Sequence, residues 1–284
     1  MGYNPELDWV YKALGISVIR VGVEMPASLD DKSIGRDYFD TVRSAGMELM
    51  VDIRCQSSLA RQPEAAKEYG AYCELVVSTI PECTEFILWD EPNCPVYSAI
   101  GLPSYAFMLR AGYARIKSIR PNALVYNGGL GMHGDTWGIR DFVDAGCLDY
   151  TDALNIHPYF YDEDPREVIK SLKDLLRLVS RLEKPPLITE WGVPTAPTPS
   201  RLPSAIYQEG VPVHGEDQQA WIVEQALQLF SRFRVELCVL FIWDMVIGSV
   251  THWSQTCGLL KSEATGYQPK EAFYAVKRWR ASTH

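Results

Sequence analysis

Two glutamates stand directly after short apolar segments, in positions suited to acid–base and nucleophilic chemistry. Glu91 follows Phe86–Trp89, and Glu190 follows Leu187–Thr189. A protonated carboxyl can give its proton to a leaving oxygen, while an ionised carboxyl can attack the carbon that this oxygen leaves. Two such groups facing each other are what cleavage of a glycosidic bond requires. The sequence therefore predicts Glu91 as the acid/base and Glu190 as the nucleophile.

A second set of residues lies in or after the apolar segments, and these are the candidates for substrate binding: Arg20, Asp90, Asn127, Trp137, His157, Tyr159, Trp191 and Trp243. Arg20 and His157 are cations that could hold Glu190 ionised, since a nearby positive charge favours the carboxylate. Arg20 could instead pair with a structural acid such as Glu24 or Asp52. His157 could equally be a core histidine whose ring is satisfied by hydrogen bonds.

The aromatic candidates have two interpretations as well. Trp243 is predicted to form a platform on which the apolar face of a sugar ring stacks. Trp137 and Trp191 fit this role or the core, because large aromatic side chains often fill protein interiors. Asn127 precedes two glycines that can also mark a simple turn. The histidines show no ligand-pair spacing, so the sequence predicts no metal site and no metal-dependent hydrolase.

These residues need a scaffold, and the chain alternates short apolar segments with longer segments of helical period. That alternation is typical of βαβ units around a parallel sheet. The predicted strands are Val18–Val23, Leu49–Ile53, Phe86–Trp89, Leu124–Asn127, Ala153–His157, Leu187–Thr189 and Val239–Trp243. The pattern predicts one (β/α)8 barrel domain over residues 1–284, whose active site is built from the carboxyl ends of its strands. Only three residues precede the first helix, so the first strand is expected to be short or missing.

Helix boundaries are marked by local signals. Asn4-Pro5-Glu6 combines an N-cap residue, proline in the first turn and an acidic residue, which predicts a helix start. Pro165 opens a second helix with one apolar face, and further helices are expected over Glu216–Phe233 and Pro269–Trp279. The proline-rich segment Val193–Gly215 is expected to be a long loop that forms a wall or lid at the active-site face.

Bulk composition narrows the possible partners. The chain has 284 residues, 47% of them hydrophobic, and a formal net charge of −9. Nucleic-acid binding needs a basic face, so a nucleic-acid partner is not expected. No signal peptide is expected at the start, which leaves the compartment open, and the most apolar run, Leu237–Val250, is too short to span a bilayer. The oligomeric state is not readable from the sequence.

Seven cysteines include no CxxC pair, which argues against a zinc knuckle. Cys83 and Cys94 are close enough in sequence to form a disulfide. Buried reduced cysteines are nevertheless the preferred interpretation, because Cys83 and Cys94 flank a predicted strand end.

Five motifs together resemble those of clan A retaining glycoside hydrolases, with families 5 and 39 the most similar. They are Trp89-Asp90-Glu91-Pro92-Asn93, Thr189-Glu190-Trp191-Gly192, Val18-Ile19-Arg20-Val21, His157-Pro158-Tyr159 and Trp243, in the order and spacing of that clan. The resemblance implies a (β/α)8 barrel, double displacement with retention, a β-linked substrate and no cofactor.

One residue departs from this pattern. The family has asparagine before the acid/base, with an amide that contacts the sugar and the nucleophile, whereas this chain has Asp90. An ionised aspartate can only accept hydrogen bonds. Asp90 is therefore expected either to be protonated, so that its hydroxyl replaces the amide as donor, or to repel Glu190 and slow the reaction. Two alternative functions therefore stay open beside hydrolysis. One is a pseudoenzyme that binds carbohydrate without cleaving it, and the other is a transglycosylase that uses the same two carboxyl groups.

Overall fold

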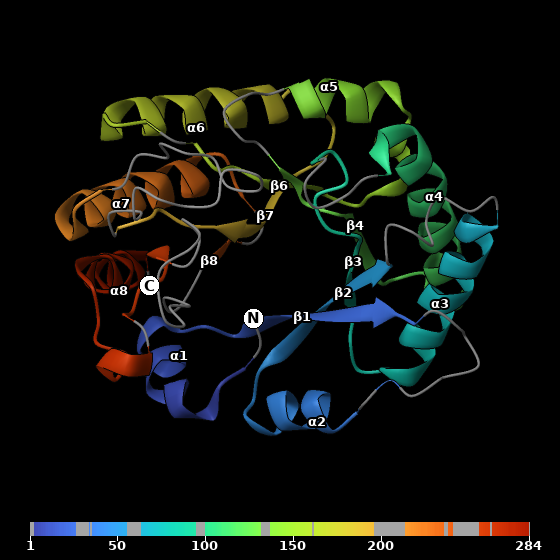
Figure 1. Cartoon of the computed structure of the whole chain (residues 1–284), viewed down its shortest axis with the longest axis horizontal. Coiled ribbons are helices and arrows are strands. Elements are labelled where there is room, and N and C mark those ends of the chain that lie inside the picture. The colour runs from blue at the N-terminus through green and yellow to red at the C-terminus, as the bar shows by residue number, and fades with distance from the viewer. Residues whose placement is uncertain are drawn as a thin grey trace. The chain divides into compact units, whose positions relative to one another are not determined.

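The computed structural model describes residues 3–26, 34, 36–55, 64–94, 100–131, 137–160, 162–195, 214–235, 238–240, 256–261 and 263–283. They form two compact units. The first contains the described residues up to Gly131 and those from Trp137 to Ile156; the second begins at His157. The elements of each unit are labelled in Figure 1.

The first unit is built on a parallel sheet in the order β1-β2-β3-β4. Its strands are β1 (Val18–Met25), β2 (Glu48–Cys55), β3 (Glu85–Leu88) and β4 (Leu124–Asn127), and the short β5 (Leu130–Gly131) and the start of β6 (Leu154–His157) also belong to this unit. In β2 and β3 nearly every residue is buried, as expected for parallel strands covered on both faces. The strands run in the same direction, so their carboxyl ends lie at one edge of the sheet.

The helices η1 (Pro5–Leu7) and α1 (Asp8–Leu14) precede β1. The later ones lie between strands: α2 (Asp37–Ser44), α3 (Ala65–Thr79), α4 (Gly101–Ile119), α5 (Trp137–Asp144) and η2 (Cys147–Tyr150). Helices α3 and α4 pack side by side on the right of Figure 1. The side chain of Asn4 caps η1 by accepting a hydrogen bond from the backbone N–H of Glu6, so the predicted helix start is confirmed. Before η1, the described residues contain no strand.

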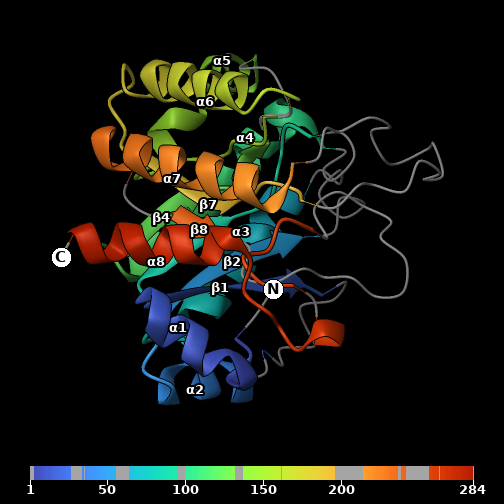
Figure 2. The ribbon, with the colours of Figure 1, turned by 90° about the vertical axis from the view of Figure 1, so that its left-hand side faces the viewer.

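The second unit contains β7 (Pro186–Trp191) paired in parallel with β8 (Cys238–Leu240). Its helices are α6 (Pro165–Val179), α7 (Glu216–Arg232), η4 (Glu263–Thr265) and α8 (Glu271–Thr283), and Figure 2 shows α7 and α8 lying along each other. Asp164 caps α6, and Pro165 opens it as predicted. The last helix begins later than the predicted Pro269–Trp279, because Pro269 instead pairs with Leu260 in a β-bridge, and it continues to Thr283.

All seven predicted strands are present, each displaced by at most a few residues, and β5 is an addition that two residues are too short to signal. The six cysteines whose side chains are described are buried and reduced, which confirms the preferred interpretation for them; Cys83 and Cys94 form no disulfide. None of the helices in the described ranges combines the length and the apolarity that crossing a bilayer would require.

Candidate active site

The backbone that carries Glu91 has an unusual conformation just beyond β3. Trp89 has φ 81° and Glu91 has φ 38°, both in the left-handed region that non-glycine residues rarely adopt. Trp89 is buried and packs edge-on against Tyr69, with ring centroids 6.0 Å apart. The carboxyl-bearing Glu91 is only 5% exposed. Two such residues within three positions store backbone strain, which persists only where the surroundings enforce it and which clusters at functional sites.

Gly128 and Tyr105 enforce this conformation. A Cβ on Gly128 would lie 2.7 Å from the carbonyl carbon of Trp89, so only glycine lets the two backbones approach this closely. The hydroxyl of Tyr105, fully buried on α4, donates to the carbonyl of Leu88 at 2.8 Å and accepts from the N–H of Gly128 at 2.8 Å. One phenol thereby joins the end of β3 to the residue after β4, directly before the strained turn.

Tyr105→Phe is expected to loosen this turn. The substitution leaves a buried N–H and a buried carbonyl without their shared partner, which costs about 1–3 kcal/mol of stability. Because the loss falls one residue from Trp89, we expect any activity that depends on Glu91 to fall as well, by about 10-fold. Urea unfolding and kcat of the variant check both effects, with Tyr113→Phe as the control, because the hydroxyl of Tyr113 bonds the half-buried Asp152, which precedes β6. Equal effects of the two variants would contradict a special role for Tyr105.

Asn93 fixes the other end of the motif. Its side-chain amide donates to the carbonyl of Gly131 at 2.8 Å, and its side-chain oxygen accepts from the N–H of Gly131 at 2.9 Å. The backbone N–H of Cys94 also bonds the carbonyl of Glu91. Glu91 is therefore held between a strained strand end and a turn that is attached to β5.

Asp90 lies within a cluster of four charged side chains. Arg20 on β1 contacts Asp90 at 2.9 Å and the fully buried Asp52 on β2 at 2.6 Å. Arg54, also on β2, contacts Asp52 at 2.5 Å and Asp90 at 3.2 Å. Two guanidinium groups favour the ionised carboxylate. Of the two states that the sequence left open for Asp90, this geometry supports the ionised one, and Arg20 does pair with Asp52.

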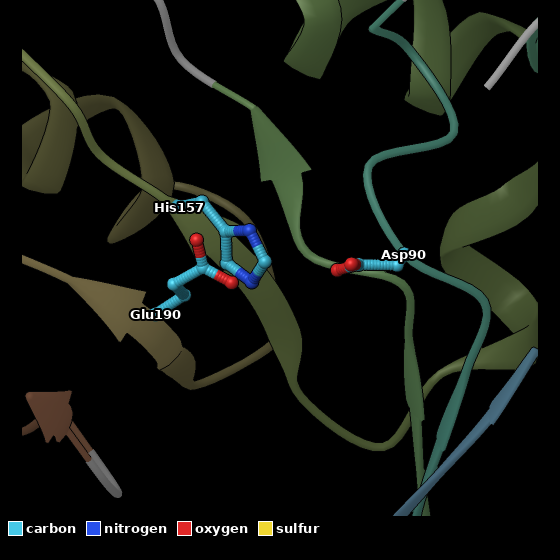
Figure 3. Close-up of side chains that lie close together, drawn as sticks. All are labelled: Asp90, His157 and Glu190. Carbon is cyan, nitrogen blue, oxygen red and sulfur yellow. The ribbon is translucent and has the colours of Figure 1, made fainter. Parts of the chain in front are cut away.

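Glu190 lies in β7, within the second unit. The hydroxyl of Tyr159 donates to Oε1 of Glu190 at 2.6 Å, and Tyr159 itself is 1% exposed. His157, at the end of β6, is fully buried, and its Nε2 is 3.1 Å from the hydroxyl of Thr189. Figure 3 shows the side chains of His157 and Glu190 beside each other, and Asp90 on the loop that leaves β3. Tyr159 thus orients the carboxylate, and Thr189 orients the imidazole.

Two predicted binding residues have structural contacts instead. Asn127 is fully buried, and its amide donates to the carbonyls of Gly128 and Asn155 while its oxygen accepts from the N–H of Asn155. It joins β4 to β6. Trp191 is 2% exposed and packs edge-on against Phe230 of α7, with ring centroids 5.4 Å apart. These contacts give both residues a structural role in the interior.

The remaining aromatic candidates cannot be placed. Trp243 and most of the predicted loop Val193–Gly215 lie outside the described residues, as does the side chain of Trp137.

Sequence reasoning missed Arg54, Asp52 as its partner, and Tyr105. The signal for the first two was available: Asp52 and Arg54 are charged residues two positions apart in the otherwise apolar segment Leu49–Cys55. Such spacing places both on one face of a strand.

Comparison with known proteins bears on the fold. No protein-family model and no curated protein sequence matches the chain. A family 39 glycoside hydrolase from the gut symbiont Bacteroides cellulosilyticus WH2 is similar in structure, with a TM-score of 0.65 and 17% identity over 95% of this chain and 59% of that one. A glucosidase from Croceicoccus marinus has a TM-score of 0.67 and 14% identity, over 96% of this chain and 62% of that one.

A structure of fungal β-1,4-galactanases has a TM-score of 0.65 and 16% identity, over 97% of this chain and 91% of that one. This chain thus spans less than two thirds of the first two proteins and nearly all of the third. At sequence identities this low, the structural similarity establishes the fold alone. The resemblance found in the five motifs is confirmed at that level, and the chain has the (β/α)8-barrel fold of the clan A glycoside hydrolases.

Proposed function

We propose that this chain is a retaining glycoside hydrolase that cleaves β-linked glycosides or polysaccharides, with residues 1–284 acting as one catalytic domain. The observation that carries the proposal is the place of Glu91 and Glu190, beyond β3 and in β7, on a fold whose catalytic groups come from the carboxyl ends of the strands. The strained backbone at Glu91 and the Tyr159 hydrogen bond to Glu190 support it, because each fixes a carboxyl in one orientation.

The reaction has two steps. Glu190 attacks the anomeric carbon while Glu91 protonates the departing glycosidic oxygen, so the carbon–oxygen bond breaks and a covalent glycosyl-enzyme forms. Glu91, now a carboxylate, then removes a proton from water. The resulting nucleophile attacks the anomeric carbon and releases Glu190, so that two inversions leave the configuration retained. The sugar-binding proposal for Arg20, Asp90, His157, Tyr159, Trp243 and Trp137 goes with this mechanism.

The test is turnover of a panel of β-linked glycosides and polysaccharides, including β-glucosides and β-1,4-galactan. We expect hydrolysis of at least one member, and proton NMR at early times shows the β-anomer as the first product. The α-anomer as first product would contradict the retaining mechanism. Sugar binding without turnover would identify a pseudoenzyme, and transfer to an acceptor sugar in preference to water would identify a transglycosylase.

A further inference from the structure

Asp52 anchors both arginines that contact Asp90. It is fully buried, and its Oδ2 accepts from Nη2 of Arg20 at 2.6 Å and from Nε and Nη2 of Arg54 at 2.8 and 2.5 Å. Arginine donors fixed on one carboxylate in this way have little freedom to turn. The contacts from the same two guanidinium groups to Asp90 are therefore set by a residue inside the sheet.

Strand geometry explains why Arg54 reaches Asp90. Asp52 and Arg54 are two residues apart on β2 and point to the same face. Gly22 of β1 lies opposite Asp52 in the parallel register, and a Cβ on Gly22 would meet Nε of Arg54 at 3.7 Å, an ordinary van der Waals distance. The guanidinium of Arg54 therefore lies beside Gly22. Burial alone would lower the pKa of Arg54, but Asp52 and Asp90 beside it raise that pKa overall, so the side chain stays charged.

Arg54 and Asp90 together offer what a single asparagine would offer at this position. An asparagine side chain carries one acceptor and one donor group, whereas an ionised aspartate carries acceptors alone. Arg54 brings N–H donors to within 3.2 Å of the Asp90 carboxylate, and its side chain is 39% exposed. A hydroxyl-rich ligand at this edge could therefore donate to Asp90 and accept from Arg54.

We propose that Arg54 is a positioning and specificity-determining residue, which holds Asp90 as an ionised acceptor next to Glu91 and supplies the donor that aspartate lacks. This inference rests on the proposed function, since the ligand is the sugar that is cleaved. It follows that Asp90→Asn does not improve the enzyme, because Arg54 already provides the donor and the substitution removes the charge that the two arginines are arranged to bind.

The test is a double-mutant cycle of Arg54→Gln and Asp90→Asn. We expect Arg54→Gln to lower kcat/KM about 10- to 100-fold in the wild-type background and less than about 3-fold in the Asp90→Asn background. Arg54→Lys keeps the charge and is expected to lose less than Arg54→Gln. The control is Arg43→Gln, since Arg43 of α2 is similarly exposed and pairs with Glu82 at 3.5 Å, near the amino ends of β1 and β2. Asp90 follows the carboxyl end of β3, so this variant is expected to stay within about 2-fold of the wild type. Equal losses from Arg54→Gln in both backgrounds would overturn the inference.

The double-mutant cycle contains the wild type, Arg54→Gln, Asp90→Asn and the double variant. Thermal unfolding midpoints of these proteins separate this inference from the proposed function, because they need no turnover. Arg54→Gln is expected to lower the midpoint more in the wild-type background than in the Asp90→Asn background. A wild-type protein that hydrolyses no glycoside contradicts the proposed function. Coupling in the midpoints without coupling in kcat/KM would make the pair purely structural and overturn the inference. If Arg54→Gln does not fold, Arg54→Lys in both backgrounds provides the same comparison.

Discussion

Glu190→Ala is expected to lower kcat by about 10⁴-fold or more on any glycoside that the wild-type protein hydrolyses, because the covalent intermediate can no longer form. The fold should be unaffected, since Glu190 is only half-buried and the hydroxyl of Tyr159, which donates to it, can bond water instead. Steady-state kinetics together with an unfolding curve measure the two effects. The matched control is Glu183→Ala, which removes an exposed carboxyl three residues before β7 and should change neither quantity.

Azide makes the same experiment diagnostic of mechanism. A small anion can enter the space that the Glu190 carboxylate leaves and attack the anomeric carbon from the same side. The expected product from a β-glycoside is an α-glycosyl azide, which NMR identifies. Glu91→Ala is expected to behave differently: it should lose about 10²–10⁴-fold with poor leaving groups and much less with activated aryl glycosides, because those need no proton. A Glu190→Ala protein that keeps a tenth of its activity would show that the nucleophile is elsewhere.

Gly128→Ala is expected to have the largest effect of any single methyl group in the first unit. The added carbon would lie 2.7 Å from the carbonyl carbon of Trp89, 2.8 Å from its oxygen and 3.0 Å from the oxygen of Leu88. All three are backbone atoms, so the contact cannot be relieved by turning a side chain. We expect a loss of about 2–3 kcal/mol in the free energy of unfolding, and a fall in kcat of about 100-fold as Glu91 is displaced.

The comparison for Gly128→Ala is Gly215→Ala. A Cβ at Gly215 meets nothing closer than 4.0 Å, and its φ of −64° suits any residue. Urea unfolding and kcat of both variants should therefore differ sharply between the two positions. If Gly128→Ala matched Gly215→Ala in both measurements, the close backbone approach at Trp89 would not be a requirement of the fold.

The parts of this fold that the sequence predicts well are those determined by local chemistry. Apolar segments locate the strands to within a few residues, and Asn4-Pro5 and Asp164-Pro165 mark helix starts because cap and proline effects act within one turn. The left-handed conformation of Trp89 and Glu91 could not be predicted. Neither residue type prefers it, and it is imposed by groups far along the chain, chiefly Gly128 and Tyr105.

The side-chain network was harder still to predict. Asp90 is recognisable as a departure from a motif, but its partner Arg54 belongs to no motif and reaches it only because β2 and β3 pair in the observed register. Conversely, Asn127 and Trp191 have types that suit ligand binding at a strand end, and only their hydrogen bonds and packing assign them to the interior. Residue type limits what a side chain can do, and tertiary structure decides which of those possibilities is used.

The side chain of Asn93 imitates a peptide group. Its carboxamide presents one N–H and one C=O to the C=O and N–H of Gly131, the same exchange that two residues make across a β-ladder. The loop that follows β3 is thereby bonded to β5, a strand outside the β1–β4 sheet. The segment that carries Glu91 therefore lies between two sets of hydrogen bonds, those of β3 within its sheet and those of Asn93 to Gly131. We expect its backbone to be as rigid as a strand, although the segment is a loop.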